Sequence, residues 1–186
     1  PKRPLANCEL MQNAVPLLNG QPPDKQITAF WQQLAYIMLK DGKTALGGTE
    51  VMGIADSLAT EADGQVNRTL TNQLQKSVQD TPLFVTWSNG SLSCRGILWR
   101  DYLAARHLAA QLDEATAAAR LYDPDWAQTL RFYVAQVNPA PLAKQLLQGQ
   151  DNSPSRESVF QVASWLPVTA EKGEWRRQTM ILLGQM

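Results

Sequence analysis

The sequence predicts a mainly α-helical fold with one β-hairpin, and two patterns carry that prediction. In most segments the apolar residues recur at steps of three and four, which is typical of helices with one buried face. Residues 83–95 (LFVTWSNGSLSCR) differ, because Asn89-Gly90 lies between two runs of strand-forming residues. Asn-Gly tolerates the positive φ angles of a tight hairpin turn, so this stretch predicts two paired strands.

A long helix is predicted directly after the hairpin, over residues 97–112 (ILWRDYLAARHLAAQL). Its apolar residues keep one face at helical spacing. This stripe consists of Leu98, Tyr102, Ala105, Leu108, Ala109 and Leu112. We therefore expect Tyr102 and Leu108 to face the core, and Arg106 and His107 to face outward.

Residues 26–112 are predicted to form the first domain, preceded by an N-terminal helix and loop in residues 1–25. Helices are expected at 26–39, 49–59 and 66–78, the second of them capped by Thr49, with a short extended piece at 44–46. The order is then helix, strand, helix, helix, two strands, helix. Three helices with a hairpin are the layout of a winged helix, so we expect a winged-helix-like domain here.

The rest of the chain is predicted to be helical. Residues 113–150 form an extension with helices at 115–120, after Asp123-Pro124, and at 142–147. A polar linker is expected at 148–156. Residues 151–186 then predict a helical hairpin, which either completes a bundle or starts an α-solenoid; both stay open, because one pair of helices shows no period.

Composition narrows the possible environments. The 186 residues are 44% hydrophobic, and 17 basic residues balance 17 acidic ones, so strong attraction to nucleic acid or anionic membranes is not expected. No run reaches the ~18 apolar residues of a membrane span, and no secretory signal pattern is present. Cys8 and Cys94 are far apart, which favours a reduced, cytoplasmic chain. A start at Pro1 and an unfinished helical pattern at Met186 predict a piece of a longer protein.

Residues 92–111 (LSCRGILWRDYLAARHLAAQ) resemble the end of the winged-helix region in NACHT-type STAND signalling NTPases. There a hairpin enters a helix through a pattern like Phe-x-His-x-x-Phe-x-Glu-Tyr-x-Ala-Ala. The matching positions here are Trp99, Asp101, Tyr102, Ala104 and Ala105. Residues 123–136 (DPDWAQTLRFYVAQ) are similar to that family's next helix, and 34–38 (LAYIM) to an early one. The resemblance covers roughly residues 26–136.

Two positions depart from that pattern. Cys94 replaces the first aromatic residue and Gly96 replaces the His, which in this family contacts the phosphate of the bound nucleotide. Arg95 lies beside Gly96 and is the candidate cofactor-binding residue in its place. No phosphate-binding loop of the form Gly-x-x-x-x-Gly-Lys-Ser/Thr is present, since Gly42-Lys43-Thr44 lacks the upstream Gly. The resemblance therefore places ATP or ADP in an NTPase domain outside this chain.

No catalytic or metal-binding residue is predicted. His107 is the only His and has no partner at ligand spacing, and Ser93 lacks the surroundings of a nucleophile. Arg100, Asp101 and Arg106 are candidates for an interdomain surface, with a solvated helix face as the alternative. All six tryptophans are expected mostly in the core, with Trp99 closing the hairpin over the start of the following helix.

The leading hypothesis for function is a non-catalytic regulatory region of a NACHT-like STAND NTPase. The resemblance implies that it couples nucleotide state to a downstream sensor or effector. Its partners would be the NTPase domain and the sensor repeats of the same protein, or a separate protein ligand. One alternative is a winged-helix nucleic-acid-binding module, for which the candidate recognition helix 66–78 carries only Arg68 and Lys76. The other is a helical protein-interaction scaffold.

Overall fold

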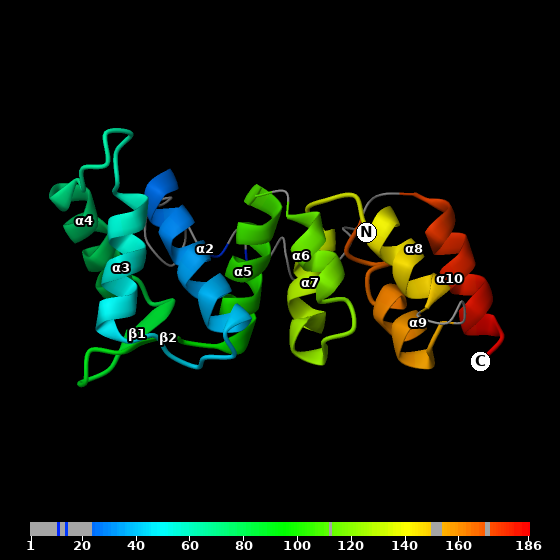
Figure 1. Ribbon diagram of the computed structural model, residues 1–186. Helices are drawn as coiled ribbons and strands as arrows, with labels where there is room; N and C mark the ends of the chain where they lie inside the picture. Colours follow the sequence, from blue (N-terminus) through cyan, green and yellow to red (C-terminus); the bar gives the residue numbers. More distant parts are fainter. Residues whose placement is uncertain (1–10, 12–13, 15–23, 112, 150–153, 170–171) are drawn as a thin grey trace. The chain divides into compact units, whose positions relative to one another are not determined.

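The computed structural model describes residues 11, 14, 24–111, 113–149, 154–169 and 172–186 (Figure 1). The fold is mainly helical with one two-stranded antiparallel hairpin in the described residues, as the sequence predicts. Its elements are α2 (Lys25–Lys40), α3 (Gly48–Leu58), α4 (Arg68–Asp80), β1 (Phe84–Thr86), β2 (Leu92–Cys94), α5 (Ile97–Gln111), α6 (Glu114–Ala119), η1 (Pro124–Trp126), α7 (Ala127–Val134), α8 (Ala140–Gln148), α9 (Arg156–Ala163) and α10 (Glu174–Gly184). The helix expected near the N-terminus lies almost entirely outside the described residues.

The chain divides into two compact units, and the boundary between them falls inside α5. We call the described part of Leu10–His107 the hairpin unit and the described part of Leu108–Met186 the helical unit. None of the helices described is long and apolar enough to cross a lipid bilayer.

In the hairpin unit, α2, α3 and α4 pack on one another, and β1 packs against α4 (Figure 1). Leu46 forms an isolated antiparallel bridge with Leu92 of β2, which is the short extended piece predicted at 44–46. The observed order is therefore helix, bridge, helix, helix, two strands, helix. The core is apolar and includes the fully buried side chains Phe30, Leu34, Met38, Leu46, Leu74 and Leu83. This is the winged-helix-like layout that the sequence predicts.

Two helix starts differ from the prediction because other groups cap them. Gly47, not Thr49, is the N-cap of α3, and the Glu50 carboxylate accepts a hydrogen bond from the Gly47 N–H at 2.8 Å. Asn67 caps α4 by accepting from the Leu70 N–H at 3.1 Å, so the helix begins at Arg68. A cap side chain satisfies one of the free N–H groups of the first turn and so determines where the helix starts.

The hairpin pairs Phe84 with Cys94, Val85 with Ser93 and Thr86 with Leu92. Asn89-Gly90 lies in its turn, as predicted, but the loop between Trp87 and Ser91 has three residues. The Gly90 N–H donates to the Trp87 carbonyl at 2.9 Å, and Gly90 has a φ of 78°. This is the turn plus left-handed residue expected of a three-residue hairpin loop.

In the helical unit, α8, α9 and α10 pack on one another as a small bundle (Figure 1). The predicted pairing of α9 with α10 is thus confirmed, and α8 joins it. The helix predicted after Asp123-Pro124 starts with η1, where Asp123 accepts from the Asp125 N–H at 3.1 Å. Fully buried side chains of this unit include Leu121, Trp126, Leu130, Phe132, Leu146 and Trp165.

Helix α5 is buried differently from the prediction. Tyr102 and Leu108 are buried as expected, but Leu98 is 54% exposed, so its place in the buried stripe was wrong. The five consecutive residues from Asp101 to Ala105 are all buried. A helix buried over such a wide face shows no single stripe, and Leu98 lies in its first turn, before that buried stretch begins. Arg106 and His107 are half-buried rather than turned fully outward.

Most tryptophans occupy the core as predicted: Trp31, Trp126, Trp165 and Trp175 are buried. Trp99 is half-buried and meets the edge of the Tyr102 ring at 6.2 Å between ring centres. Trp87 contradicts the prediction, because 56% of it is exposed. It follows β1 on the hairpin loop, where no other element covers the ring.

Candidate functional site

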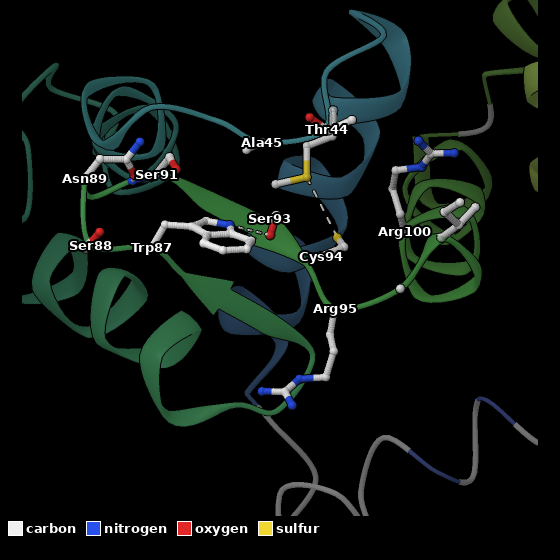
Figure 2. Close-up of a pocket in the computed structure, with 13 residues that line it drawn as sticks. Thr44, Ala45, Trp87, Ser88, Asn89, Ser91, Ser93, Cys94, Arg95 and Arg100 are labelled. Carbon is white, nitrogen blue, oxygen red and sulfur yellow. Dashed lines mark hydrogen bonds between the residues drawn. The ribbon is translucent and has the colours of Figure 1, made fainter.

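A groove of about 630 Å³ runs beside the hairpin, within the hairpin unit (Figure 2). We call it the hairpin groove. Its walls come from the end of α2, from Thr44-Ala45, from the hairpin between Trp87 and Arg95, and from the start of α5. Three of the positions that sequence analysis singled out, Arg95, Gly96 and Arg100, line it together.

Sulfur and apolar side chains form one part of this groove. The Cys94 thiol donates to the Met38 Sδ at 3.8 Å, the contact drawn as a dashed line from Cys94 in Figure 2. Burial raises the pKa of the Cys94 thiol to about 12, so the thiol is neutral at physiological pH. A neutral, buried thiol is a weak nucleophile, and here it serves as an apolar surface.

Two exposed apolar side chains border the groove. Ile97 is 69% exposed, and the exposed Trp87 ring donates from Nε1 to the Ser93 Oγ at 3.0 Å. Large apolar side chains that lie exposed around one groove mark a binding surface more often than single scattered ones do. Sequence analysis missed both residues, because Trp87 was placed in the core and Ile97 received no role. The sequence did contain one signal for this surface, which is the position of the aromatic residue Trp87 directly beside the predicted hairpin turn.

Among the described residues, the groove lining contains two arginines and no carboxylate. Arg95 is exposed, forms no ion pair with the described residues, and extends away from Cys94 (Figure 2). Arg100 donates from Nε and Nη2 to one carboxylate oxygen of Asp101, at 2.9 and 2.8 Å. The groove therefore carries positive charge, partly compensated by the carboxylate behind Arg100.

Asp101 is only 2% exposed and pairs with Arg100, so it does not lie on a solvated helix face, while its interdomain role stays a prediction. Burial raises the pKa of this carboxyl group, while the hydrogen bond from Arg100 acts in the opposite direction. Asp101 thus holds the Arg100 guanidinium in place from beneath. Arg106 does not line the groove, so of the four predicted site residues Arg95 and Arg100 line it, and Asp101 pairs with Arg100.

The described residues contain no group of three or more His, Cys, Asp or Glu that could hold a metal ion. His107 stacks on Tyr36, with 4.6 Å between ring centres and 23° between the planes.

A second groove, of about 880 Å³, lies in the helical unit between the η1–α7 segment and α9. We call it the helical groove. Tyr122 and Phe160 are exposed beside it, and its charged lining mixes Arg131 with Asp123 and Glu157. It resembles the hairpin groove in exposing aromatic rings but not in the sign of its charge.

The surface expected for nucleic-acid binding is weakly basic. On α4, Arg68 donates to Asp56 at 3.2 Å, while Lys76 is exposed. Neutralising phosphates requires several uncompensated cations, so α4 lacks the usual basic surface of a recognition helix.

In comparisons with known proteins, no protein-family model, no curated protein and no solved structure matches this chain.

Proposed function

We propose that this chain is a non-catalytic regulatory region of a NACHT-like STAND NTPase. In this proposal the hairpin unit docks on the NTPase domain, and the helical unit connects it to a sensor or effector in the cytoplasm. One observation carries the proposal. Arg95, Gly96 and Arg100 lie in the segment that resembles the family, and all three line the hairpin groove. A groove with exposed apolar side chains and two arginines is a reasonable docking surface for another protein segment.

The physical basis of such regulation is a difference in docking between two states. If the ADP-bound NTPase domain contacts the hairpin groove more tightly than the ATP-bound form, the contact stabilises the ADP state by that difference in affinity. ATP and ADP would bind in the NTPase domain, with Arg95 as the residue of this chain placed to contact a phosphate. The chain alone is then expected neither to bind ATP with micromolar affinity nor to hydrolyse it, which titration calorimetry would check.

The proposal is tested by the coding sequence upstream of Pro1 and by the longer protein that it encodes. We expect a Gly-x-x-x-x-Gly-Lys-Ser/Thr loop upstream. In that longer protein, Arg95→Gln should speed the release of a fluorescent ADP analogue several-fold, because a docking contact is weakened. Lys76→Gln is the matched control, since it removes an exposed cation that does not line the groove. The absence of a phosphate loop, or equal release rates for both variants, would contradict the proposal.

A further inference from the structure

We infer that the hairpin groove binds an extended acidic peptide segment, which adds as a strand to the open edge of β2. This deepens the proposed function, on which it rests for the location of the site, by naming the class of partner that the groove accepts. The inference depends on the backbone hydrogen bonds of the hairpin, on a third strand that ends early, and on the distribution of charge.

The hydrogen bonds of the hairpin show which backbone groups face outward. The Trp87 N–H donates to the Ser91 carbonyl at 2.8 Å, and the Arg95 N–H donates to the Leu83 carbonyl at 2.9 Å. In an antiparallel pair, hydrogen-bonded and non-hydrogen-bonded residue pairs alternate. Leu92 and Cys94 therefore belong to non-hydrogen-bonded pairs with β1, so their N–H and C=O groups point to the opposite edge of β2.

At that edge a third strand begins but does not continue. Leu46 and Leu92 exchange two backbone hydrogen bonds, both of 2.8 Å. The next pair in the same register would join Thr44 to Cys94, yet no hydrogen bond joins them. Among the described residues, the Cys94 N–H and C=O groups have no backbone partner. Thr44 and Cys94 both line the hairpin groove, so the part of the β2 edge that lacks a paired strand faces this groove.

Gly96 extends the open edge by one more donor. Its carbonyl accepts from Trp99 and Arg100 at the start of α5, but its N–H donates to no described residue. A Cβ built at Gly96 would meet no described atom within 4 Å apart from its chain neighbours, so the side-chain position is open. The N–H groups of Cys94 and Gly96 and the C=O of Cys94 are thus available to an added strand, in the manner of β-augmentation.

Side chains of the groove indicate what that strand should carry. Successive side chains of a strand point to opposite faces. Cys94 shares the face of the Met38 thioether, which suits an apolar side chain, while Arg95 lies on the other face and is free to pair with a carboxylate. Because the described residues that line the groove include two arginines and no carboxylate, the fitting segment alternates apolar and acidic residues.

The test uses the whole chain and a short peptide that alternates valine with glutamate. Fluorescence polarisation of the labelled peptide should show saturable binding. A second peptide, N-methylated at every other amide, cannot pair as a strand and should bind about tenfold more weakly or not at all. A third, with lysine in place of glutamate, should not bind. Arg95→Gln should weaken binding several-fold, whereas Lys76→Gln should not change it.

Amide hydrogen exchange measured by NMR locates the contact. The Cys94 and Gly96 amides should gain protection when the valine–glutamate peptide binds, while the Arg95 amide, already bonded within the hairpin, should change little. Equal binding of the methylated peptide, or binding without protection of Cys94 and Gly96, would overturn strand addition. Failure of the valine–glutamate peptide to bind would also overturn it. None of these results depends on a phosphate loop upstream of Pro1, so this inference and the proposed function can fail separately.

Discussion

The hairpin groove and the helical groove both expose aromatic side chains, but they offer a partner different kinds of bond. Residues on the helices that line the helical groove satisfy most of their backbone groups within each helix, so binding there depends on side chains. The hairpin groove adds a strand edge, where the N–H and C=O groups of Cys94 have no backbone partner among the described residues. Its described lining also carries two arginines without a carboxylate, whereas the described lining of the helical groove carries charges of both signs. A single short hairpin in a helical protein thus creates the surface with the clearest binding chemistry.

The two units also differ in how their buried polar atoms are satisfied. In the hairpin unit, the Trp31 Nε1 donates to the Ser77 Oγ at 3.0 Å, and the buried Thr71 hydroxyl donates to Asp56 at 2.9 Å. In the helical unit, three buried atoms lack a partner among the described residues: the Thr129 Oγ1, the Gln161 Nε2 and the Trp165 Nε1. An unpaired buried polar atom costs free energy of folding. We therefore expect these three atoms to destabilise the helical unit, whereas the paired polar atoms of the hairpin unit carry no such cost.

The largest expected effect tests the apolar packing of α5, the helix that contains the boundary between the two units in the sequence. Leu108 is fully buried, so Leu108→Ala should lower the free energy of unfolding by about 2–5 kcal/mol, through lost contacts and the cavity left behind. The half-buried Arg106 is the control on the same helix, and Arg106→Ala should cost less than about 1 kcal/mol. Urea denaturation midpoints measure both. An equal or larger loss for Arg106→Ala would contradict the burial of this helix.

The next effect concerns the polar contacts of the hairpin unit. Ser77→Ala removes the acceptor of the Trp31 indole and leaves a buried N–H unpaired. We expect a loss of about 1–3 kcal/mol in the free energy of unfolding. Ser77→Thr, which keeps a hydroxyl group, should retain most of the stability. If Ser77→Ala is neutral in thermal unfolding, the claim that this unit relies on paired polar groups is wrong.

In the helical unit the corresponding change should have the opposite sign. Thr129→Val replaces a buried hydroxyl that has no partner with a methyl group of the same shape. The free energy of unfolding should rise by up to about 1 kcal/mol, because an unsatisfied polar atom is removed. Thr71→Val in the hairpin unit is the matched control and should be destabilising, since it breaks the hydrogen bond to Asp56. Destabilisation by both substitutions would remove the contrast between the units.

The smallest effect is a pH dependence at the base of the hairpin groove. Because the pKa of Asp101 is raised in the folded state, this group binds more protons folded than unfolded, between its ordinary pKa near 3.8 and its raised value. Its contribution to stability therefore falls as the pH rises through that window. The free energy of unfolding of the native chain minus that of Asp101→Asn should therefore decrease as the pH rises through this window. A difference that is constant, or grows with pH, would show that this carboxyl is not perturbed by burial.

Local patterns in the sequence were sufficient for most elements of the fold. Apolar spacing predicted the helices and their order, Asn89-Gly90 placed the hairpin turn, and Asp123-Pro124 marked the start at η1. These features depend on interactions between near neighbours in the chain, which the sequence displays directly. The starts of α3 and α4 were predicted less accurately, because more than one residue near each start can serve as the N-cap, and Gly47 and Asn67 do so.

Tertiary structure alone decided the burial of α5 and the form of the candidate site. Asp101 and Arg100 are adjacent in the chain and both charged, yet one is buried and the other lines the groove, because burial depends on what packs against the helix. The exposure of Trp87 likewise follows from the lack of a neighbour over the hairpin loop. The open edge at Cys94 exists because the third strand ends at Leu46, and pairing between such distant segments leaves no local mark in the sequence.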